Sequence, residues 1–479
     1  MPKPPLARVV SATAAWGWAM TSWKRARIIP VQGIAKASEA EQRATSATLA
    51  VLSIVRPFSK TVLSPYGASR ADRALVETFV EVTFKSSTGG TVRPDGLIRV
   101  SYGKQEPWTA LVEVKTGTSA LDADQVNAYW DVARAEGFDA VLTISNEIAP
   151  SPGVHPTDGL KQRVNSKVKI HHLSWTRLLT AAVIEKSHRG VDDPEQDWIL
   201  GELIRYLEHD ASGAMGFDDM GASWSDVHRG ARNGTLNARS DDVLEIAQRW
   251  DQLLGFVSLR LGADIGEDVT EVLPRAQQQD QRLRTKAFVD SLCDDGVLEG
   301  TLRVPNTIGD LDVEVDLKAR QIAVSVSFDA PADKSAKARI SWLLRQLRDA
   351  PDLLVVDAYP KNSRDGEAAS LHVAKEDPSL LIDESGRPPH RFRVTARSEM
   401  AQSRRRRGQR PGFVESVRDA IASFYGDVLQ DLTAYQEKAP KLMPMATVEA
   451  DLPSVPLNES IPPPPSRSSP STELPEPQP

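Results

Sequence analysis

Two short stretches of the sequence combine carboxylates with a basic side chain. The first is Arg93-Pro94-Asp95-Gly96, and the second is Glu113-Val114-Lys115. Because side chains alternate along a strand, Glu113 and Lys115 would project from one face while Val114 turns towards the core. A neighbouring strand that carries Asp95 would add a second carboxylate. Two carboxylates in a cleft suit Mg²⁺ or Mn²⁺, because such ions prefer oxygen ligands and retain waters.

Such a site predicts hydrolysis of a phosphodiester bond. A bound divalent ion screens the charge of the phosphate and lowers the pKa of a bound water. Lys115 can hold that water and stabilise the charge that grows on the phosphorus oxygens. The carbonyl of Val114 is a candidate for a further metal ligand. No covalent protein intermediate is needed.

The elements that must position these residues follow from the alternation of the two hydrophobic periods. A helix over 38–55 begins with Ser38 as a cap and Glu41 three residues later, the spacing of a capping box. Beyond it the pattern predicts a helix, three strands, a helix and a strand, extended by a strand and a helix. These lie at 70–78, 80–84, 91–100, 108–115, 122–136, 140–145, 168–173 and 175–184.

This order, with Pro-Asp on one strand and Glu-x-Lys on the next, resembles the PD-(D/E)xK nuclease superfamily and its restriction-endonuclease-like αβββαβ core. The resemblance covers residues 66–183, about a quarter of the 479 residues. It implies that Asp95 and Glu113 bind the metal and that Lys115 is the catalytic lysine. It also implies a Mg²⁺- or Mn²⁺-dependent nuclease that acts on nucleic acid, with DNA as the expected partner.

The resemblance extends to three further positions. Gln125 and Tyr129, one turn apart on the helix after the Glu-x-Lys strand, are similar to the QxxxY feature of RecB-type nucleases, which positions the substrate. Many members place a glutamate near the end of the first helix. Glu77 is the residue chosen for that role, with Glu81 as its competitor.

Each of these residues also has a structural interpretation. Asp95 before a glycine is ordinary turn chemistry, and Glu113 with Lys115 could form a weak ion pair on a solvated strand face. Gln125 could complete a capping box that begins at Asp122. Tyr129 lies on an apolar helix face and could simply fill the core. Glu77 could be a surface helix residue.

The whole chain is predicted to be an α/β protein with several parts. An arm and a helix occupy residues 1–60, and the nuclease-like domain occupies 61–187. A helical region follows over 188–299, then a second, smaller α/β module over 300–437. The proline-rich segment 438–479 cannot build a core and is predicted to be disordered.

Composition narrows the function classes. The formal net charge of −7 argues against a protein that coats nucleic acid, although it permits a nuclease with a local basic patch. The single cysteine, Cys293, cannot form an internal disulfide, which favours a reducing cytoplasm. No run of about 18 apolar residues predicts a membrane span. The alternative function is a catalytically silent nucleic-acid- or protein-binding chain whose C-terminal half binds a partner.

Overall fold

The computed structural model describes residues 27–31, 36–85, 89–149, 154–161, 165–214, 216–404 and 410–436. The predicted proline-rich tail and most of the N-terminal arm lie outside these residues. The described part is a mixed α/β structure with two main sheets and a short two-stranded one, which pairs β2 (Phe84–Lys85) with β3 (Thr91–Val92).

The first sheet has five strands in the order β1-β4-β5-β6-β7. Its strands are β1 (Leu75–Val80), β4 (Gly96–Ser101), β5 (Trp108–Val114), β6 (Ala140–Ser145) and β7 (Lys169–Ser174). The first three pair antiparallel, whereas β5, β6 and β7 run parallel. Parallel neighbours need a crossover connection, and the helix α3 (Ala123–Glu136) supplies it between β5 and β6.

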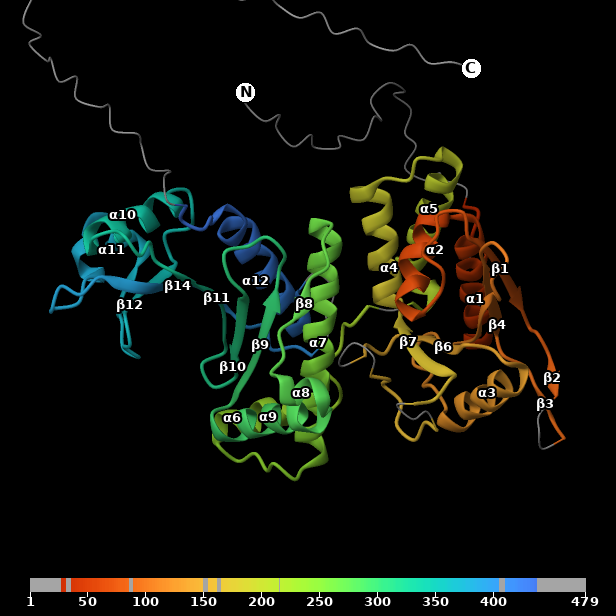
Figure 1. Ribbon diagram of the computed structural model, residues 1–479. Helices are drawn as coiled ribbons and strands as arrows, with labels where there is room; N and C mark the ends of the chain where they lie inside the picture. Colours follow the sequence, from red (N-terminus) through yellow and green to blue (C-terminus); the bar gives the residue numbers. More distant parts are fainter. Residues whose placement is uncertain are drawn as a thin grey trace, which may run out of the picture. The chain divides into compact units, whose positions relative to one another are not determined.

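Two hydrophobic layers cover this sheet, and Figure 1 shows α3 separated from the other helices by the strands. On the α3 face, Leu111 and Val141 pack against Val126 and Tyr129. The opposite face packs against four helices: α1 (Ala37–Ile54), α2 (Arg56–Leu63), α4 (Trp175–Val183) and α5 (Pro194–Leu207). Both faces are therefore buried, which explains why β6 is apolar almost throughout.

The first strand, β1, lies at the outer edge of the sheet. Among the described residues it pairs with β4 only. Its apolar side chains are unusually open: Leu75 is 58% exposed, Phe79 43% and Val80 50%. Glu77 is the one charged residue within the strand.

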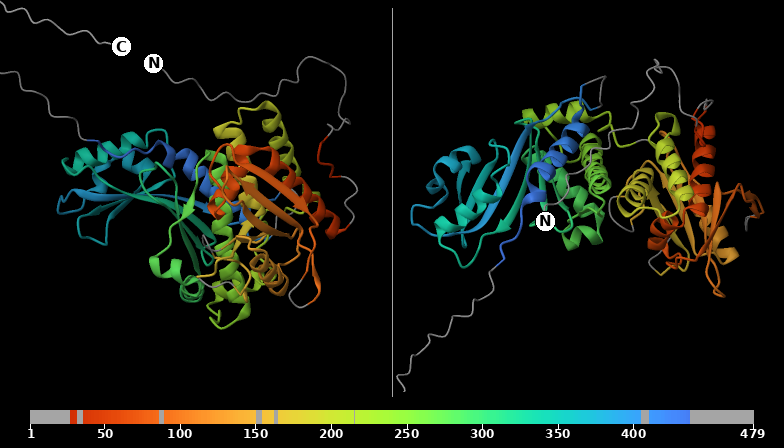
Figure 2. Two further views of the ribbon diagram at one scale, coloured as in Figure 1. Left: turned by 45° about the vertical axis from the view of Figure 1, so that its right-hand side comes forward. Right: turned by 90° about the horizontal axis from the view of Figure 1, so that it is seen from above.

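The second sheet has seven antiparallel strands in the order β13-β12-β14-β11-β10-β9-β8. They are β8 (Thr270–Glu271), β9 (Val297–Arg303), β10 (Leu311–Asp316), β11 (Gln321–Asp329), β12 (Val355–Pro360), β13 (Glu367–Ser370) and β14 (Pro389–Glu399). Seven helices accompany it: α6 (Trp224–Asn233), α7 (Asp241–Ile265), α8 (Arg275–Gln279), α9 (Gln281–Asp294), α10 (Ala336–Gln346), α11 (Leu371–Glu376) and α12 (Phe413–Asp427). In the right-hand view of Figure 2 the blue helix α12 lies against this sheet.

One hydrophobic core unites the second sheet with these helices. Trp250 of α7 and Val289 of α9 belong to the same cluster as Val313 of β10 and Val394 of β14. The predicted boundary near residue 300 therefore runs through a shared core. Buried within it, Arg284 of α9 contacts the carboxylates of Asp251 and Glu271, so three charged groups lie together away from water.

Several sequence predictions of secondary structure are confirmed. The helices predicted at 38–55, 122–136 and 175–184 appear as α1, α3 and α4 within two residues at each end. The strand predicted at 140–145 is β6. Within the second α/β module predicted over 300–437, apolar and polar residues alternate at 311–317 and 322–328, and these segments form β10 and β11.

Three local predictions are wrong. The strand predicted at 80–84 does not form, because β1 ends at Val80 and β2 begins at Phe84. Residues 70–78 do not form a helix, because Leu75–Val80 forms the strand β1, paired with β4. The β-branched and aromatic residues of this segment fit a pleated edge, and that pairing overrides a helical reading of its apolar spacing. The capping box at Ser38 and Glu41 is also absent, since Lys36 is the N-cap of α1 and no side chain caps it.

No helix among the described residues is both long enough and apolar enough to span a lipid bilayer.

Candidate active site

The strand β5 brings Glu113 and Lys115 together at its C-terminal end. The ammonium Nζ of Lys115 lies 2.6 Å from Oε1 of Glu113. The flanking Val112 and Val114 turn the other way and are fully buried in the core beneath α1. The alternation predicted from the sequence is therefore confirmed. The weak, solvated ion pair is excluded, because the side chain of Glu113 is only 1% exposed.

Asp95 lies beside this pair, directly before β4. Its Oδ2 accepts a hydrogen bond of 2.8 Å from the backbone N–H of Val114. In an extended strand the N–H and C=O of one residue point to the same side, so the carbonyl of Val114 also faces Asp95. The following Gly96 is required by packing, because a Cβ there would lie 2.4 Å from Cδ1 of Leu49 on α1.

A third carboxylate reaches the site from α1. Oε2 of Glu41 lies 3.9 Å from Nζ of Lys115, so the ammonium contacts carboxylates of two elements. Sequence reasoning assigned Glu41 to a helix cap and missed this contact. No local signal distinguishes Glu41 from Glu39, two residues earlier, because the contact depends on how α1 packs against β4 and β5.

Glu77, the glutamate chosen from the sequence, does not join the site. It lies on β1 opposite Arg99, which is four residues from Asp95, a distance of about 13 Å along an extended strand. Its competitor Glu81 is nearer, because its N–H donates to the carbonyl of Asp95. The carboxylate of Glu81, however, lies 3.9 Å from the guanidinium of Arg93, and both side chains are more than half exposed.

The helix α3 directs Gln125 and Tyr129 towards the carboxylates. Nε2 of Gln125 donates to the hydroxyl of Tyr129 at 2.8 Å, and that hydroxyl lies 3.3 Å from the carbonyl of Arg93 and in contact with Glu113. The capping-box interpretation of Gln125 is wrong, because Asp122 caps the helix through the N–H of Asp124 alone. The ring of Tyr129 is buried in the core, so packing and site contact coexist in one residue.

The electrostatics of the site centre on Glu113. Burial, reinforced by the nearby carboxylate of Asp95, raises the pKa of Glu113 to about 7, although hydrogen bonds from Lys115 and Tyr129 act in the opposite direction. Burial lowers the pKa of Lys115, but its carboxylate neighbours outweigh burial and leave that pKa above its ordinary value. Burial and the charge of Glu113 raise the pKa of Tyr129. At pH 7 and below, a proton and a cation would compete for Glu113.

The donor set fits a hard divalent cation. Oε2 of Glu113 is buried and has no hydrogen-bond partner among the described residues, although burial of such an oxygen is costly. Asp95 and the Val114 carbonyl add oxygen donors on the same side. No cluster of three or more His, Cys, Asp or Glu side chains with metal-binding geometry occurs within the described ranges. Two carboxylates and a carbonyl suffice for Mg²⁺, because this ion keeps several waters.

The neighbouring strands continue the face of Glu113 with a hydrogen-bonded chain. Thr143 pairs with Glu113 in the ladder, and its hydroxyl contacts Nε2 of His155 at 2.8 Å and Nδ1 of His172 at 2.9 Å. Burial lowers the pKa of both His155 and His172 to about 4, so both rings are neutral at pH 7. The sequence patterns did not predict this chain.

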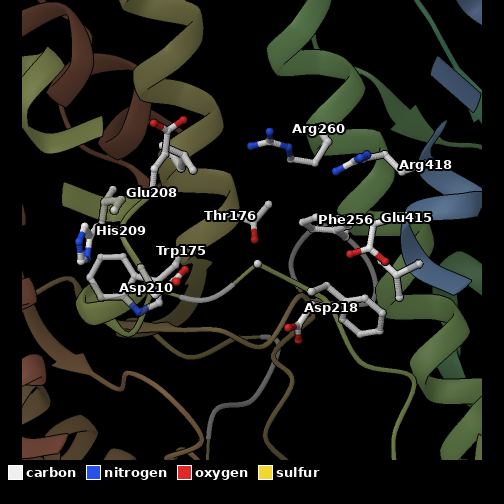
Figure 3. A pocket seen from close by; sticks show the side chains of 16 residues that line it. Trp175, Thr176, Glu208, His209, Asp210, Asp218, Phe256, Arg260, Glu415 and Arg418 are labelled. Atoms are coloured by element: carbon white, nitrogen blue, oxygen red, sulfur yellow. The ribbon is translucent and has the colours of Figure 1, made fainter. Parts of the chain in front are cut away.

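A separate pocket of about 610 Å³ lies beyond the candidate site. Figure 3 shows Arg260 and Arg418 on one side of it, with His209 and Trp175 on the other. Its lining contains both acidic and basic side chains. It contains none of the residues that the sequence predicts to bind metal or substrate or to act in catalysis. Trp175 is the link to the candidate site, because its indole N–H donates to the carbonyl of Lys115 at 2.8 Å.

Comparison with known proteins gives no relative: no family model, no curated protein and no solved structure matches this chain.

Proposed function

We propose that the N-terminal half of this protein is a Mg²⁺- or Mn²⁺-dependent nuclease of the PD-(D/E)xK type that hydrolyses phosphodiester bonds, with DNA as its substrate. The single observation that carries the proposal is the meeting of Asp95, Glu113 and Lys115 at the adjoining ends of β4 and β5. Apart from the short elements α2, β2 and β3, the chain around these residues runs in the order α1, β1, β4, β5, α3 and β6, which is a helix, three antiparallel strands, a crossover helix and a parallel strand. That order supports a restriction-endonuclease-like core.

Within this proposal the carboxylates hold the metal. Asp95 and Glu113 supply side-chain oxygens, and the carbonyl of Val114 adds a third. The bond from the Val114 N–H orients Asp95, while the bond from Lys115 orients Glu113. The metal, when bound, neutralises phosphate charge and lowers the pKa of its water. A preformed donor set reduces the reorganisation needed when substrate arrives.

Lys115 and Glu41 act on the nucleophile and the phosphate. The ammonium of Lys115 can donate a hydrogen bond to the attacking water and another to a phosphate oxygen on which charge develops. Glu41 contacts that ammonium at 3.9 Å, in addition to Glu113 at 2.6 Å, so carboxylates of two elements restrain it. Glu41 therefore replaces Glu77 in the proposal as the helix glutamate. Gln125 and Tyr129 contribute by positioning.

The test is cleavage of single-stranded DNA, duplex DNA and RNA by the full chain, in Mg²⁺ or Mn²⁺ and in EDTA. Glu113→Ala and Lys115→Ala remove the metal ligand and the amine. Glu106→Ala and Lys104→Ala are matched controls, because both are exposed in the turn before the same strand. We expect metal-dependent cleavage by wild type and both controls, and a loss of at least about 100-fold in the two site variants.

The two outcomes against the proposal are distinct. Equal trace activity in wild type, Glu113→Ala and Lys115→Ala would show that the cleavage comes from a contaminant. Binding of nucleic acid by wild type without cleavage of any substrate would favour the alternative, a chain that binds nucleic acid without cutting it.

A further inference from the structure

The backbone from Lys115 to Gly117, directly after β5, is held by groups from three other segments. The indole N–H of Trp175 donates to the carbonyl of Lys115 at 2.8 Å. Nδ2 of Asn146 donates to the carbonyl of Gly117 at 2.9 Å. The N–H of Gly117 in turn donates to the carbonyl of Gly213 at 2.8 Å. Every one of these bonds begins or ends on the short segment that carries the amine of the candidate site.

Asn146 joins two backbone segments that are far apart in the sequence. It follows β6 directly, and its Nδ2 donates both to the carbonyl of Gly117 and to that of Gly213, each at 2.9 Å. The other amide atom, Oδ1, is buried without a partner among the described residues. Burying that oxygen costs about 1–3 kcal/mol. Only an amide nitrogen on a side chain of this length offers the two donors that this position uses.

Trp175 combines packing with a directed bond. It is the first residue of α4, it is 1% exposed, and its ring belongs to the core beneath β5. Core packing alone requires an apolar ring and not an indole N–H. The bond to Lys115 is therefore a separate feature, and Trp175→Phe removes it while keeping an aromatic ring.

The side chain of Lys115 depends on this backbone. Its Nζ lies 2.6 Å from Glu113 and 3.9 Å from Glu41, at the end of a flexible four-carbon stem. A backbone shift of about 1 Å at such a residue can lower a rate about 100-fold, because the reacting groups leave their aligned geometry.

We propose that Asn146 and Trp175 are positioning residues, which fix the backbone of residues 115–117 so that the Lys115 ammonium stays between Glu113 and Glu41. The proposal rests on the proposed nuclease function for its catalytic consequence. Its structural consequence, the placement of the ammonium, can be measured without any cleavage.

A positioning role and a merely structural role differ in what they change at Lys115. When the backbone of residues 115–117 moves, the ammonium leaves its contacts with Glu113 and Glu41 and becomes open to a reagent. The same movement lowers kcat while KM stays near its wild-type value, because the amine acts on the reacting groups. A loss of stability with intact placement of Lys115 changes neither the reactivity of its amine nor kcat per folded molecule.

The test uses the full chain with Asn146→Ala and Trp175→Phe. Two other residues make the same kinds of bond elsewhere in this domain and serve as matched controls. Nδ2 of Asn127 donates to the carbonyl of Gly159 at 3.1 Å, and the indole N–H of Trp130 donates to the carbonyl of Val168 at 3.1 Å. Asn127→Ala and Trp130→Phe therefore remove the same kind of bond from α3, where neither bond ends on residues 115–117.

The first measurement is the rate at which Lys115 reacts with an amine-acylating reagent, followed by mass spectrometry and normalised to the exposed Lys104. We expect Asn146→Ala and Trp175→Phe to react about fivefold faster at Lys115, the factor that matches the loss of about 1 kcal/mol of hydrogen bonding. The control variants should react at the wild-type rate. Unchanged labelling of Lys115 in both site variants overturns the proposal.

The second measurement is Mg²⁺-dependent cleavage, with kcat and KM determined per folded molecule. We expect kcat to fall about tenfold or more, with little change in KM, in Asn146→Ala and Trp175→Phe only. A wild-type kcat in both variants also contradicts the proposal. If wild type cleaves nothing, the nuclease function fails, while faster labelling of Lys115 in the two variants still supports the positioning role.

Discussion

Neutralising Glu113 should stabilise the protein at alkaline pH. Glu113→Gln keeps the shape of the side chain and removes the charge of a carboxylate whose side chain is only 1% exposed. Folding raises the pKa of Glu113 from 4.5 to about 7, so the folded state holds its proton more tightly than the unfolded chain does. Ionising Glu113 therefore destabilises the fold, and that penalty develops as pH rises from about 4.5 to about 7.

The magnitude follows from these two pKa values. The ionisation of Glu113 should lower the free energy of unfolding of wild type by about 3 kcal/mol at pH 8 and by about 1 kcal/mol at pH 5, compared with a protein whose residue 113 never ionises. Glu113→Gln should recover most of that difference, so its stability advantage should grow from pH 5 to pH 8. The residual contact of Lys115 with Glu41 limits the loss that the variant suffers by removing one partner of the ammonium.

The assay is urea denaturation of wild type and Glu113→Gln in EDTA at pH 5 and at pH 8. Glu106→Gln makes the same chemical change at an exposed position before the same strand, and we expect it to stay within about 0.5 kcal/mol of wild type. Two results would refute the argument that burial penalises the charge of Glu113. The first is a Glu113→Gln variant that is less stable than wild type at pH 8. The second is a difference in unfolding free energy between variant and wild type that is the same at pH 5 and pH 8.

Three further predictions follow from the same geometry. Mn²⁺ affinity, measured by titration calorimetry, should fall about tenfold from pH 8 to pH 6, because Glu113 must be ionised to bind; a pH-independent affinity contradicts its role as ligand. Tyr129→Phe should move the midpoint of that pH dependence upwards, because the Tyr129 hydroxyl lowers the pKa of Glu113, and an unchanged midpoint would show that this bond is not made. Arg284→Leu should destabilise the C-terminal half by about 3–5 kcal/mol in thermal or urea denaturation, because it leaves Asp251 and Glu271 buried together without a cation, and a neutral effect would contradict the burial of the three groups.

Local patterns predicted the centre of the candidate site well. The period of two in a strand was enough to place Glu113 and Lys115 on one face, and the order of elements was enough to bring Asp95 near them. The boundaries of β6 were predicted to the residue, because Gly137 ends α3 and an uninterrupted apolar run follows. These features depend on residues close together in the chain.

Contacts between distant segments could not be predicted in the same way. Glu41 approaches Lys115 only because α1 packs across β4 and β5, and nothing near Glu41 in the sequence indicates that packing. The same holds for Asn146 and Gly213: the side-chain amide of Asn146 donates to the backbone carbonyl of Gly213, 67 residues later in the chain. The error at β1 has a different origin: a short apolar segment fits both periods, and only its pairing with β4 decides between them.

The open edge of β1 suggests that Glu77 opposes the association of two such edges and takes no part in catalysis. A strand with a free row of backbone donors and acceptors, and with Leu75, Phe79 and Val80 facing water, is a template on which a second chain can add a strand and begin to aggregate. Glu77 is the single charge in that strand, so two such edges in antiparallel contact would bring like carboxylates close together. We expect this repulsion to oppose edge-to-edge pairing of two copies, so an uncharged residue at position 77 should increase aggregation.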